Sequence, residues 1–198
     1  MFYKVSEQIT SWFCEMRVIP AEDRELYRYG VQHGFILLLN LATAILIGWA
    51  CNMLVESLVF LVSYIPLRQY AGGYHAKSNI RCYVYSIVMI LVVLLTLRLS
   101  CWNFGISLIV ISIGLCIILT FAPVEDSNKP LDELEVKVYR KKSYQFAIVD
   151  ICLFMIAAVL NQQRMYETVA LSILSLGILV LIGKIEDSFH QNEKHDGR

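Results

Sequence analysis

At 198 residues the chain has the size of one large domain or one small membrane bundle. Hydrophobic residues make up 57% and charged residues 17% of the chain, whereas soluble domains average about 45–50% and about 25%. Lys+Arg and Asp+Glu balance at 17 each, so the sequence gives no sign of a nucleic-acid surface. The composition therefore favours the membrane bundle.

The first residues predict an amphipathic helix. Its apolar stripe recurs at helical spacing and comprises Val5, Ile9, Trp12, Phe13 and Met16. Pro20 ends the helix and can begin a second one through AEDREL, so we expect interfacial helices over 1–30. The Trp favours a position flat in the membrane interface, and packing on the inner face of the bundle is the alternative. Because the segment lacks the basic start and apolar core of a secretory signal, we expect the mature protein to keep it.

Six apolar segments follow, each near the shortest helix that can cross the hydrocarbon core. We place them at 33–51, 53–67, 83–99, 104–122, 144–160 and 167–183. The second and fifth contain Glu56 and Asp150, and an ionisable residue inside a membrane is a functional candidate by default. The predicted fold class is an all-α polytopic membrane helix bundle, forming a single integral-membrane domain over 1–198.

The positions of the basic residues predict the orientation of the bundle. If both termini are cytoplasmic, 15 of the 17 Lys and Arg residues lie in inside segments, and only Arg98 and Arg164 fall at outside turns. This topology obeys the positive-inside rule and its mirror image violates it. We therefore expect cytoplasmic loops at 66–82 and 123–143, the second with a short helix from about Asp132 to Arg140.

The loop at 66–82 contains the residues that are best suited to carry out chemistry. Pro66 is predicted to end the incoming helix, and Gly72-Gly73 permits backbone conformations that other residues resist. Ser78 or Asn79 is a good N-cap for the third span, which places Cys82 in the first turn of that helix. The positive end of the helix dipole, with nearby basic residues, would favour a thiolate there.

A Cys82–His75 pair requires a particular backbone path. In one continuous helix the two residues would be roughly 10.5 Å apart along the axis, whereas a general base must come within about 3 Å of its proton. We therefore predict that the chain from His75 to Asn79 folds back. Taken alone, a lone His and Cys are weak evidence, and a loop histidine with an apolar-face cysteine is the simpler interpretation. The six cysteines include no CxxC pair, which argues against a zinc site or a disulfide framework.

Two longer motifs are more specific. The first is Arg68-x3-Gly72-Gly73-Tyr74-His75-Ala76, with Cys82 seven residues after the histidine; the second is Ala122-Pro123-x4-Asn128-Lys129-Pro130, before a charged loop ending in Lys141-Lys142. Both resemble the AgrB (accessory gene regulator protein B) family of bacterial membrane cysteine endopeptidases. Chain length, number of spans and order of motifs agree, so the resemblance covers nearly the whole chain.

The resemblance implies a function in quorum sensing. Proteins of this kind cleave an AgrD-like propeptide and help to form a cyclic thiolactone or lactone autoinducing peptide. Carried over by position, Cys82 is the nucleophile that forms a thioester and His75 is its general base. The resemblance also suggests a homodimer in the bacterial cell membrane, and we expect neither a metal nor a cofactor.

For each of the possible supporting residues, the sequence leaves two interpretations open. Arg68 either binds an acidic propeptide tail or anchors a helix end as a topology signal. Gly72 and Gly73 either supply backbone freedom, which we favour, or donate N–H groups to an oxyanion hole. Lys129 either binds substrate or marks topology. Asp150 either orients His75 or forms an interhelical hydrogen bond, and the hydrogen bond is favoured.

Functions from other classes stay open at this point. A small transporter or peptide exporter without proteolytic activity would explain the spans, although no repeat symmetry is visible. A membrane scaffold would explain the hydrophobicity but not the Gly-Gly-Tyr-His loop. A metalloprotease would need a motif such as HExxH, which the sequence lacks.

Overall fold

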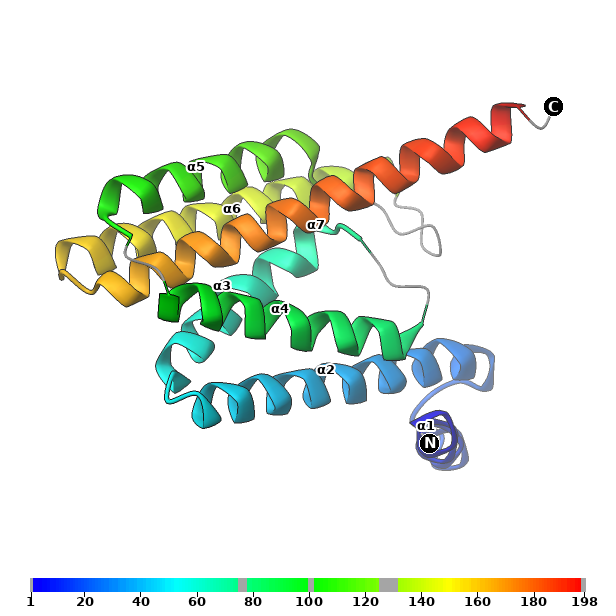
Figure 1. The fold of residues 1–198 in the computed structure, drawn as a ribbon. Coiled ribbons are helices and arrows are strands. Elements are labelled where there is room, and N and C mark those ends of the chain that lie inside the picture. The colour runs from blue at the N-terminus through cyan, green and yellow to red at the C-terminus, as the bar shows by residue number, and fades with distance from the viewer. Residues whose placement is uncertain (1, 75–77, 100–101, 125–131, 197–198) are drawn as a thin grey trace.

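The computed structural model describes residues 2–74, 78–99, 102–124 and 132–196, and almost all of them are helical (Figure 1). The elements are α1 (Phe2–Glu15), the 3-10 helix η1 (Ala21–Asp23), α2 (Arg24–Ala50), α3 (Leu54–Ala71), α4 (Asn79–Leu99), α5 (Phe104–Phe121), α6 (Glu133–Val159) and α7 (Gln163–Asp196). Within these ranges the only β-type pairing is an isolated bridge between Gly72 and Val124. The predicted all-α fold is confirmed.

The six predicted spans correspond to α2 through α7. Among the described residues, five helices are long and apolar enough to cross a membrane, namely α2, α4, α5, α6 and α7. The remaining helix, α3, carries Glu56 in its first turn and Arg68 in its last turn. Both charges complement the helix dipole, because acidic groups are favoured near the start and basic groups near the end. The chain is thus a multi-pass membrane bundle.

Pro66 does not end α3, contrary to the sequence-based prediction. The helix continues through Pro66 to Ala71, and its buried face continues with Leu67 and Ala71. A proline removes one backbone hydrogen bond, and packing of the following turn can compensate for that loss. The real end is Gly72, whose φ of 70° breaks the helix. As a result Arg68 belongs to a helix and projects from its last turn.

The predicted loop over 123–143 is helical in its second half. The expected short helix from about Asp132 to Arg140 is the beginning of α6, which runs without interruption to Val159. The Glu135 side chain accepts a hydrogen bond from the Asp132 N–H at 3.2 Å, as in a capping box. The charged residues that resembled a loop are therefore the solvated first turns of a long helix. The helix expected from AEDREL likewise merges, through η1, into α2.

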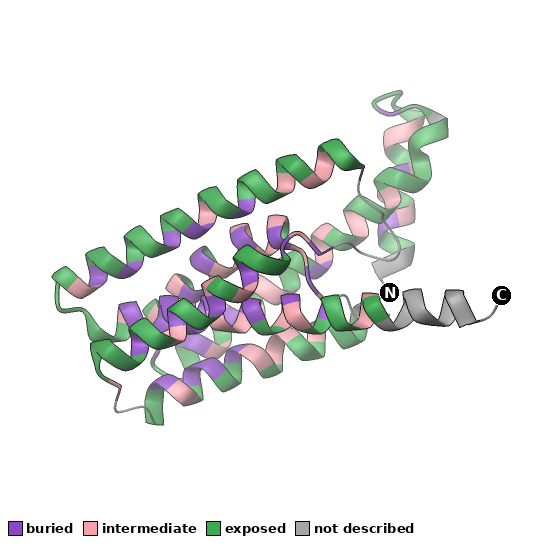
Figure 2. Cartoon of the chain, turned by 90° about the horizontal axis from the view of Figure 1, so that it is seen from above, coloured by how far each residue is buried: buried purple, intermediate pink, exposed green. Residues whose placement is uncertain are grey.

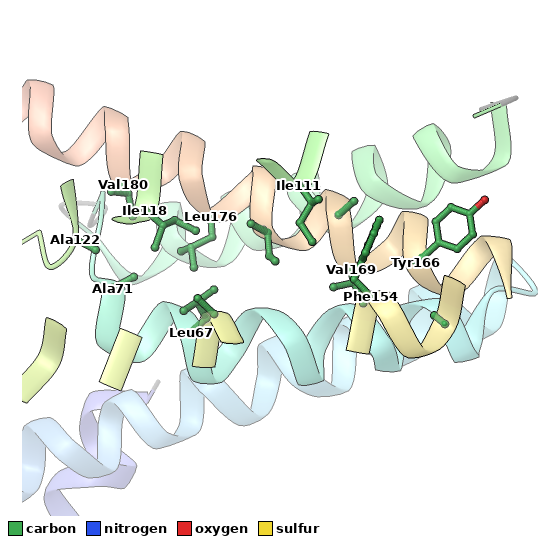
Figure 3. Packing of buried hydrophobic residues seen from close by; sticks show 14 of the residues in the cluster. Leu67, Ala71, Ile111, Ile118, Ala122, Phe154, Tyr166, Val169, Leu176 and Val180 are labelled. Carbon is green, nitrogen blue, oxygen red and sulfur yellow. The ribbon is translucent and has the colours of Figure 1, made fainter. Parts of the chain in front are cut away.

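The larger core cluster joins α3, α5, α6 and α7. Figure 3 shows Leu67, Ile118, Leu176 and Phe154 among its members. The pair α5 and α7 makes the most extensive contact in the bundle, and a Cβ on Gly177 would lie only 3.1 Å from the Gly114 Cα. Small residues that let two backbones approach in this way are typical of membrane helix packing.

A second, smaller core cluster joins α2, α3 and α4 and also contains Leu171 of α7. It includes Ala44, Phe60, Ile90 and Leu94, and Ser57 of α3 donates a hydrogen bond of 2.8 Å to the Ala44 carbonyl of α2. The outward faces of the bundle are exposed, as Figure 2 shows, and they carry many large apolar side chains. Lipid tails would cover these faces in a membrane.

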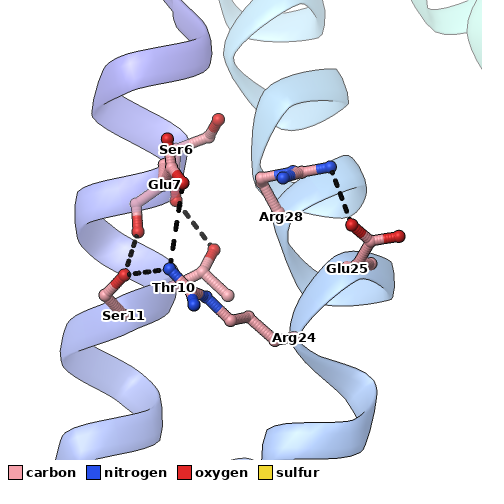
Figure 4. A network of polar contacts seen from close by, with 7 residues as sticks. All are labelled: Ser6, Glu7, Thr10, Ser11, Arg24, Glu25 and Arg28. Carbon is pink, nitrogen blue, oxygen red and sulfur yellow. Dashed lines mark hydrogen bonds and ion pairs between the residues drawn. The ribbon is translucent and has the colours of Figure 1, made fainter.

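The N-terminal helix α1 crosses the direction of the bundle and is seen end-on in Figure 1. It packs against α2, and Arg24 of α2 donates a 2.8 Å hydrogen bond to Ser11 and lies 3.8 Å from Glu7 (Figure 4). Trp12 and Met16 of the apolar stripe remain exposed. A helix across the bundle end with exposed aromatic and aliphatic side chains suits the membrane interface.

Candidate functional site

The loop after α3 begins with two glycines in conformations that favour glycine. The φ angles of Gly72 and Gly73 are 70° and 115°. A Cβ on Gly72 would collide with the Val124 carbonyl, and a Cβ on Gly73 would lie 3.0 Å from the Leu179 backbone. The Gly72 N–H also donates to the Arg68 carbonyl at 3.2 Å. These contacts favour the interpretation of the glycines as backbone freedom, and they commit the Gly72 N–H to the helix end rather than to an oxyanion hole.

Three segments far apart in the sequence meet at this loop. The Val124 N–H donates to the Ala71 carbonyl at 3.0 Å, and the Tyr74 N–H donates to the Leu179 carbonyl of α7 at 2.9 Å. Gly183 of α7 lies so close that a Cβ on it would be 2.6 Å from the Tyr74 nitrogen. The Gly-Gly-Tyr-His motif and the Ala-Pro motif are therefore in direct backbone contact, with α7 as the third side.

Arg68 holds the loop from the last turn of α3. Its guanidinium donates to the Gly72 carbonyl through Nη1 and to the Tyr74 carbonyl at 2.6 Å through Nη2. A planar guanidinium can bridge two carbonyls in this way, whereas the ammonium of a lysine is a single point charge. Sequence reasoning considered substrate binding and a topology signal for Arg68 and missed this contact with the loop backbone.

Tyr74 extends the loop toward α4. Its ring centroid lies 5.9 Å from that of Tyr85 on α4. Partial burial raises the pKa of Tyr74 above its ordinary value, and Tyr85 raises it further. A phenol with an ordinary pKa is already neutral at physiological pH, and both effects favour that neutral form.

Cys82 lies at the start of α4, as predicted. The helix begins at Asn79, the Ser78 Oγ accepts a 3.3 Å hydrogen bond from the Arg81 N–H, and the Cys82 N–H donates to the Ser78 carbonyl at 3.0 Å. Ser78 is thus the N-cap. The Cys82 thiol is free and exposed. An exposed thiol at the positive end of a helix is in a typical position for a reactive cysteine.

Two of the predicted site residues lie outside the described residues. These are His75, the predicted general base, and Lys129, in the second motif. The predicted approach of His75 to Cys82 therefore stays a prediction. Within the described ranges, no three His, Cys, Asp or Glu side chains are grouped so that they could hold a metal ion.

A cavity of about 540 Å³ lies between α2, α3 and α4. Its wall is mainly apolar, and its polar members include Asn40, Tyr64, Arg68 and Ser86. Asn40 and Tyr64 were not among the site residues predicted from the sequence, because that prediction considered only charged residues within the spans. Polar side chains inside apolar spans are costly in a membrane, and that cost is the signal that could have identified them.

Asp150 is placed away from the loop contacts described above. It is 3% exposed on α6 and lies near Ser63 of α3. No hydrogen bond joins the two side chains, because the Ser63 Oγ and the Asp150 Oδ2 are both buried without a partner among the described residues. The interhelical hydrogen bond favoured by the sequence is therefore not formed with Ser63. No described contact joins Asp150 to Cys82.

Fold and site together define a class of protein. The chain is a multi-pass α-helical membrane protein with an exposed cysteine in the first turn of α4, a glycine loop before that helix, and a mainly apolar cavity that begins one turn further along α4. The family described as accessory gene regulator B matches residues 6–182. The chain therefore belongs to the AgrB family, and this membership supports a role in quorum sensing.

Individual relatives agree with the family match. The chain is 29% identical over 140 residues to a putative AgrB-like protein 2 of Clostridium perfringens strain 13, covering 67% of this chain and 65% of that relative. It is 30% identical over 140 residues to a putative AgrB-like protein of C. perfringens strain SM101. It is 29% identical over 116 residues to accessory gene regulator protein B of Staphylococcus aureus strain Newman, covering 59% of this chain and 60% of that relative. The matches thus span less than two thirds of these relatives' own lengths. No solved structure matches the chain.

Proposed function

We propose that this protein is a membrane cysteine endopeptidase that cleaves an AgrD-like propeptide and closes the released part into a ring. The observation that carries the proposal is the exposed Cys82 thiol in the first turn of α4, next in sequence to the loop that Arg68 holds. A nucleophile needs this exposure, and the position at a helix start distinguishes Cys82 from the exposed Cys116 and Cys152, which lie within α5 and α6.

The proposed reaction has two acyl transfers. His75 removes the proton of the Cys82 thiol, and the thiolate attacks the carbonyl carbon of the scissile peptide bond. The C–N bond breaks, the amine of the C-terminal fragment leaves with the proton from His75, and the N-terminal part remains as a thioester on Cys82. A Cys or Ser side chain of the peptide then attacks the thioester and loses its proton through His75. Cys82 is released as a thiol, so no water is consumed.

The remaining site residues are proposed to support this reaction by holding the loop backbone or the propeptide in place. Arg68 and the two glycines fix the backbone that leads to His75. Lys129 is proposed to contribute to propeptide binding from the second loop. The basic-residue distribution supports cytoplasmic termini and a cytoplasmic loop, and a homodimer is part of the proposal through the family resemblance.

Co-expression with a tagged AgrD-like propeptide tests the proposal, with the peptide products identified by mass spectrometry. We expect Cys82→Ala and His75→Ala to abolish release of the C-terminal fragment, a loss of about 10³-fold or more. Cys152→Ala is the matched control, because Cys152 is also a free and exposed cysteine but lies within α6. A cyclic product one water lighter than the linear peptide would support ring closure. Equal processing by all variants would refute the peptidase proposal and favour a transporter or peptide exporter.

A further inference from the structure

The cavity between α2, α3 and α4 reaches α4 one helical turn after Cys82. Ser86, which lines the cavity, follows Cys82 by one helical turn on the same face of α4, and its hydroxyl donates to the Cys82 carbonyl at 3.0 Å. Tyr64 and Arg68 of α3 line the opposite wall. Cys82 and Ser86 are four residues apart, or about 6 Å along the helix axis, so a flexible peptide attached to the Cys82 sulfur needs to span only about one turn to reach the cavity.

The walls of the cavity fit a mainly apolar occupant of limited size. Its volume of about 540 Å³ is within the range of about 300–1,000 Å³ that is typical of small-ligand pockets. Leu37 and Leu41 of α2, Leu61 of α3 and Ile87 of α4 supply apolar surface. The space can hold a short stretch of apolar side chains but not a whole propeptide.

One polar group indicates that the occupant also carries N–H donors. The Oδ1 atom of Asn40, on the α2 wall, is buried and has no hydrogen-bond partner among the described residues. A buried acceptor without a partner is unfavourable, so an occupant that donates a hydrogen bond to it binds more tightly than one that does not. A peptide backbone has such donors, whereas a lipid acyl chain has none.

We propose that this cavity is the subsite for the acyl part of the propeptide, namely the residues on the N-terminal side of the cleaved bond that become the ring. The inference rests on the proposed function and identifies which part of the substrate is held, and where. After cleavage the C-terminal fragment leaves, but the acyl part stays bonded to the Cys82 sulfur until its own nucleophile attacks. An apolar cavity beside the sulfur keeps water away from the thioester during that interval.

Photocrosslinking in a Cys82→Ala background tests binding without requiring cleavage. Ile87→p-benzoylphenylalanine places the probe on the cavity wall, and Val88→p-benzoylphenylalanine, at the next position, places it on an exposed face of α4. We expect the probe at position 87 to crosslink the co-expressed propeptide within its ring-forming segment, and the probe at 88 not to do so. Crosslinks at 87 only to lipid, or only to the C-terminal fragment region, would overturn the proposal.

Filling the cavity tests the same idea in the active protein. Ala44→Phe adds a ring to the cavity wall, whereas Ala42→Phe adds the same ring at an exposed position on α2. We expect Ala44→Phe to reduce processing at least tenfold and Ala42→Phe to leave it unchanged, with both proteins recovered from the membrane in equal amounts. Asn40→Leu provides a milder change if Ala44→Phe does not accumulate, and should raise the KM for the propeptide about tenfold, the factor that corresponds to about 1.4 kcal/mol.

These outcomes separate the inference from the proposed function. If Cys82→Ala abolishes processing while Asn40→Leu leaves the KM unchanged and position 87 gives no peptide crosslink, the peptidase stands and the subsite is wrong. If Cys82→Ala processes normally while position 87 still crosslinks the ring-forming segment, the cavity binds the peptide but the chemistry is wrong.

Discussion

The two sides of α3 differ in how closely their neighbours pack. On one side, α5, α6 and α7 form the larger core cluster, and glycines bring α5 and α7 into backbone contact. On the other side, α2 and α4 form the smaller cluster and leave a cavity of about 540 Å³. We call these the packed side and the open side. The difference suggests that the packed side supports the fold while the open side receives the substrate, and the loop from Gly72 to Tyr74 connects them.

A substitution in the packed side should have the largest effect on the folded protein. Gly177→Leu places a branched side chain where even a Cβ would be 3.1 Å from the Gly114 Cα, and overpacking of this kind costs about 1–3 kcal/mol or more. We expect a lower Tm in detergent and less protein in the membrane. Gly30→Leu is the control, because nothing lies within 4 Å of a Cβ there. Equal Tm values for the two variants would mean that the α5–α7 contact does not hold the bundle together.

A substitution in the connecting loop should separate activity from stability. Gly73→Val forces a branched residue to a φ of 115°, a strain of about 1–3 kcal/mol, and the loop is expected to move to relieve it. We expect propeptide processing to fall at least tenfold while the Tm changes little. The measurement pairs initial processing rates with thermal unfolding of the same preparation. Unchanged processing would show that the exact path of the loop does not matter for activity.

Replacing the arginine that holds the loop should have an intermediate effect. Arg68→Lys keeps the charge but cannot bridge the carbonyls of Gly72 and Tyr74 as the guanidinium does. Loss of one charged hydrogen bond, worth about 1.5–3 kcal/mol, should slow processing by roughly tenfold or more, since about 1.4 kcal/mol corresponds to tenfold. If Arg68 acted only as a positive topology signal, lysine would restore full activity, so wild-type rates in this variant would contradict the loop-holding role.

Asp150→Asn should have the smallest effect on processing. Asparagine has nearly the same shape as aspartate, and the substitution breaks no hydrogen bond to Ser63, because the Ser63 Oγ has no partner among the described residues. We therefore expect the processing rate to stay within about twofold, as for a substitution that changes neither packing nor an existing hydrogen bond. A large loss of activity with normal folding would instead indicate that Asp150 orients His75.

Several features of the fold follow from local sequence. The long apolar runs predicted the helices, and Ser78 predicted where α4 begins, because an N-cap hydroxyl satisfies donors within its own first turn. The prediction at Pro66 was wrong because the cost of a proline is offset by packing of Leu67 and Ala71, which local sequence does not reveal. The short helix predicted from about Asp132 to Arg140 is present, but its continuity with the fifth span as α6 was missed, because its polar composition matches that of a cytoplasmic segment outside the apolar span.

The sequence by itself determined that this is a helical membrane protein, that Cys82 lies at a helix start, and that its motifs resemble those of the AgrB family. Apolar periodicity, capping and residue spacing act over a few turns, so they can be read along the chain. Only the tertiary structure decided that Ala71 pairs with Val124, that Arg68 reaches the Gly72 and Tyr74 carbonyls, and that Asn40 and Tyr64 share a cavity with Ser86. These contacts depend on how α2, α3, α4 and α7 cross, and helix crossing is set by side-chain packing between segments that are distant in sequence.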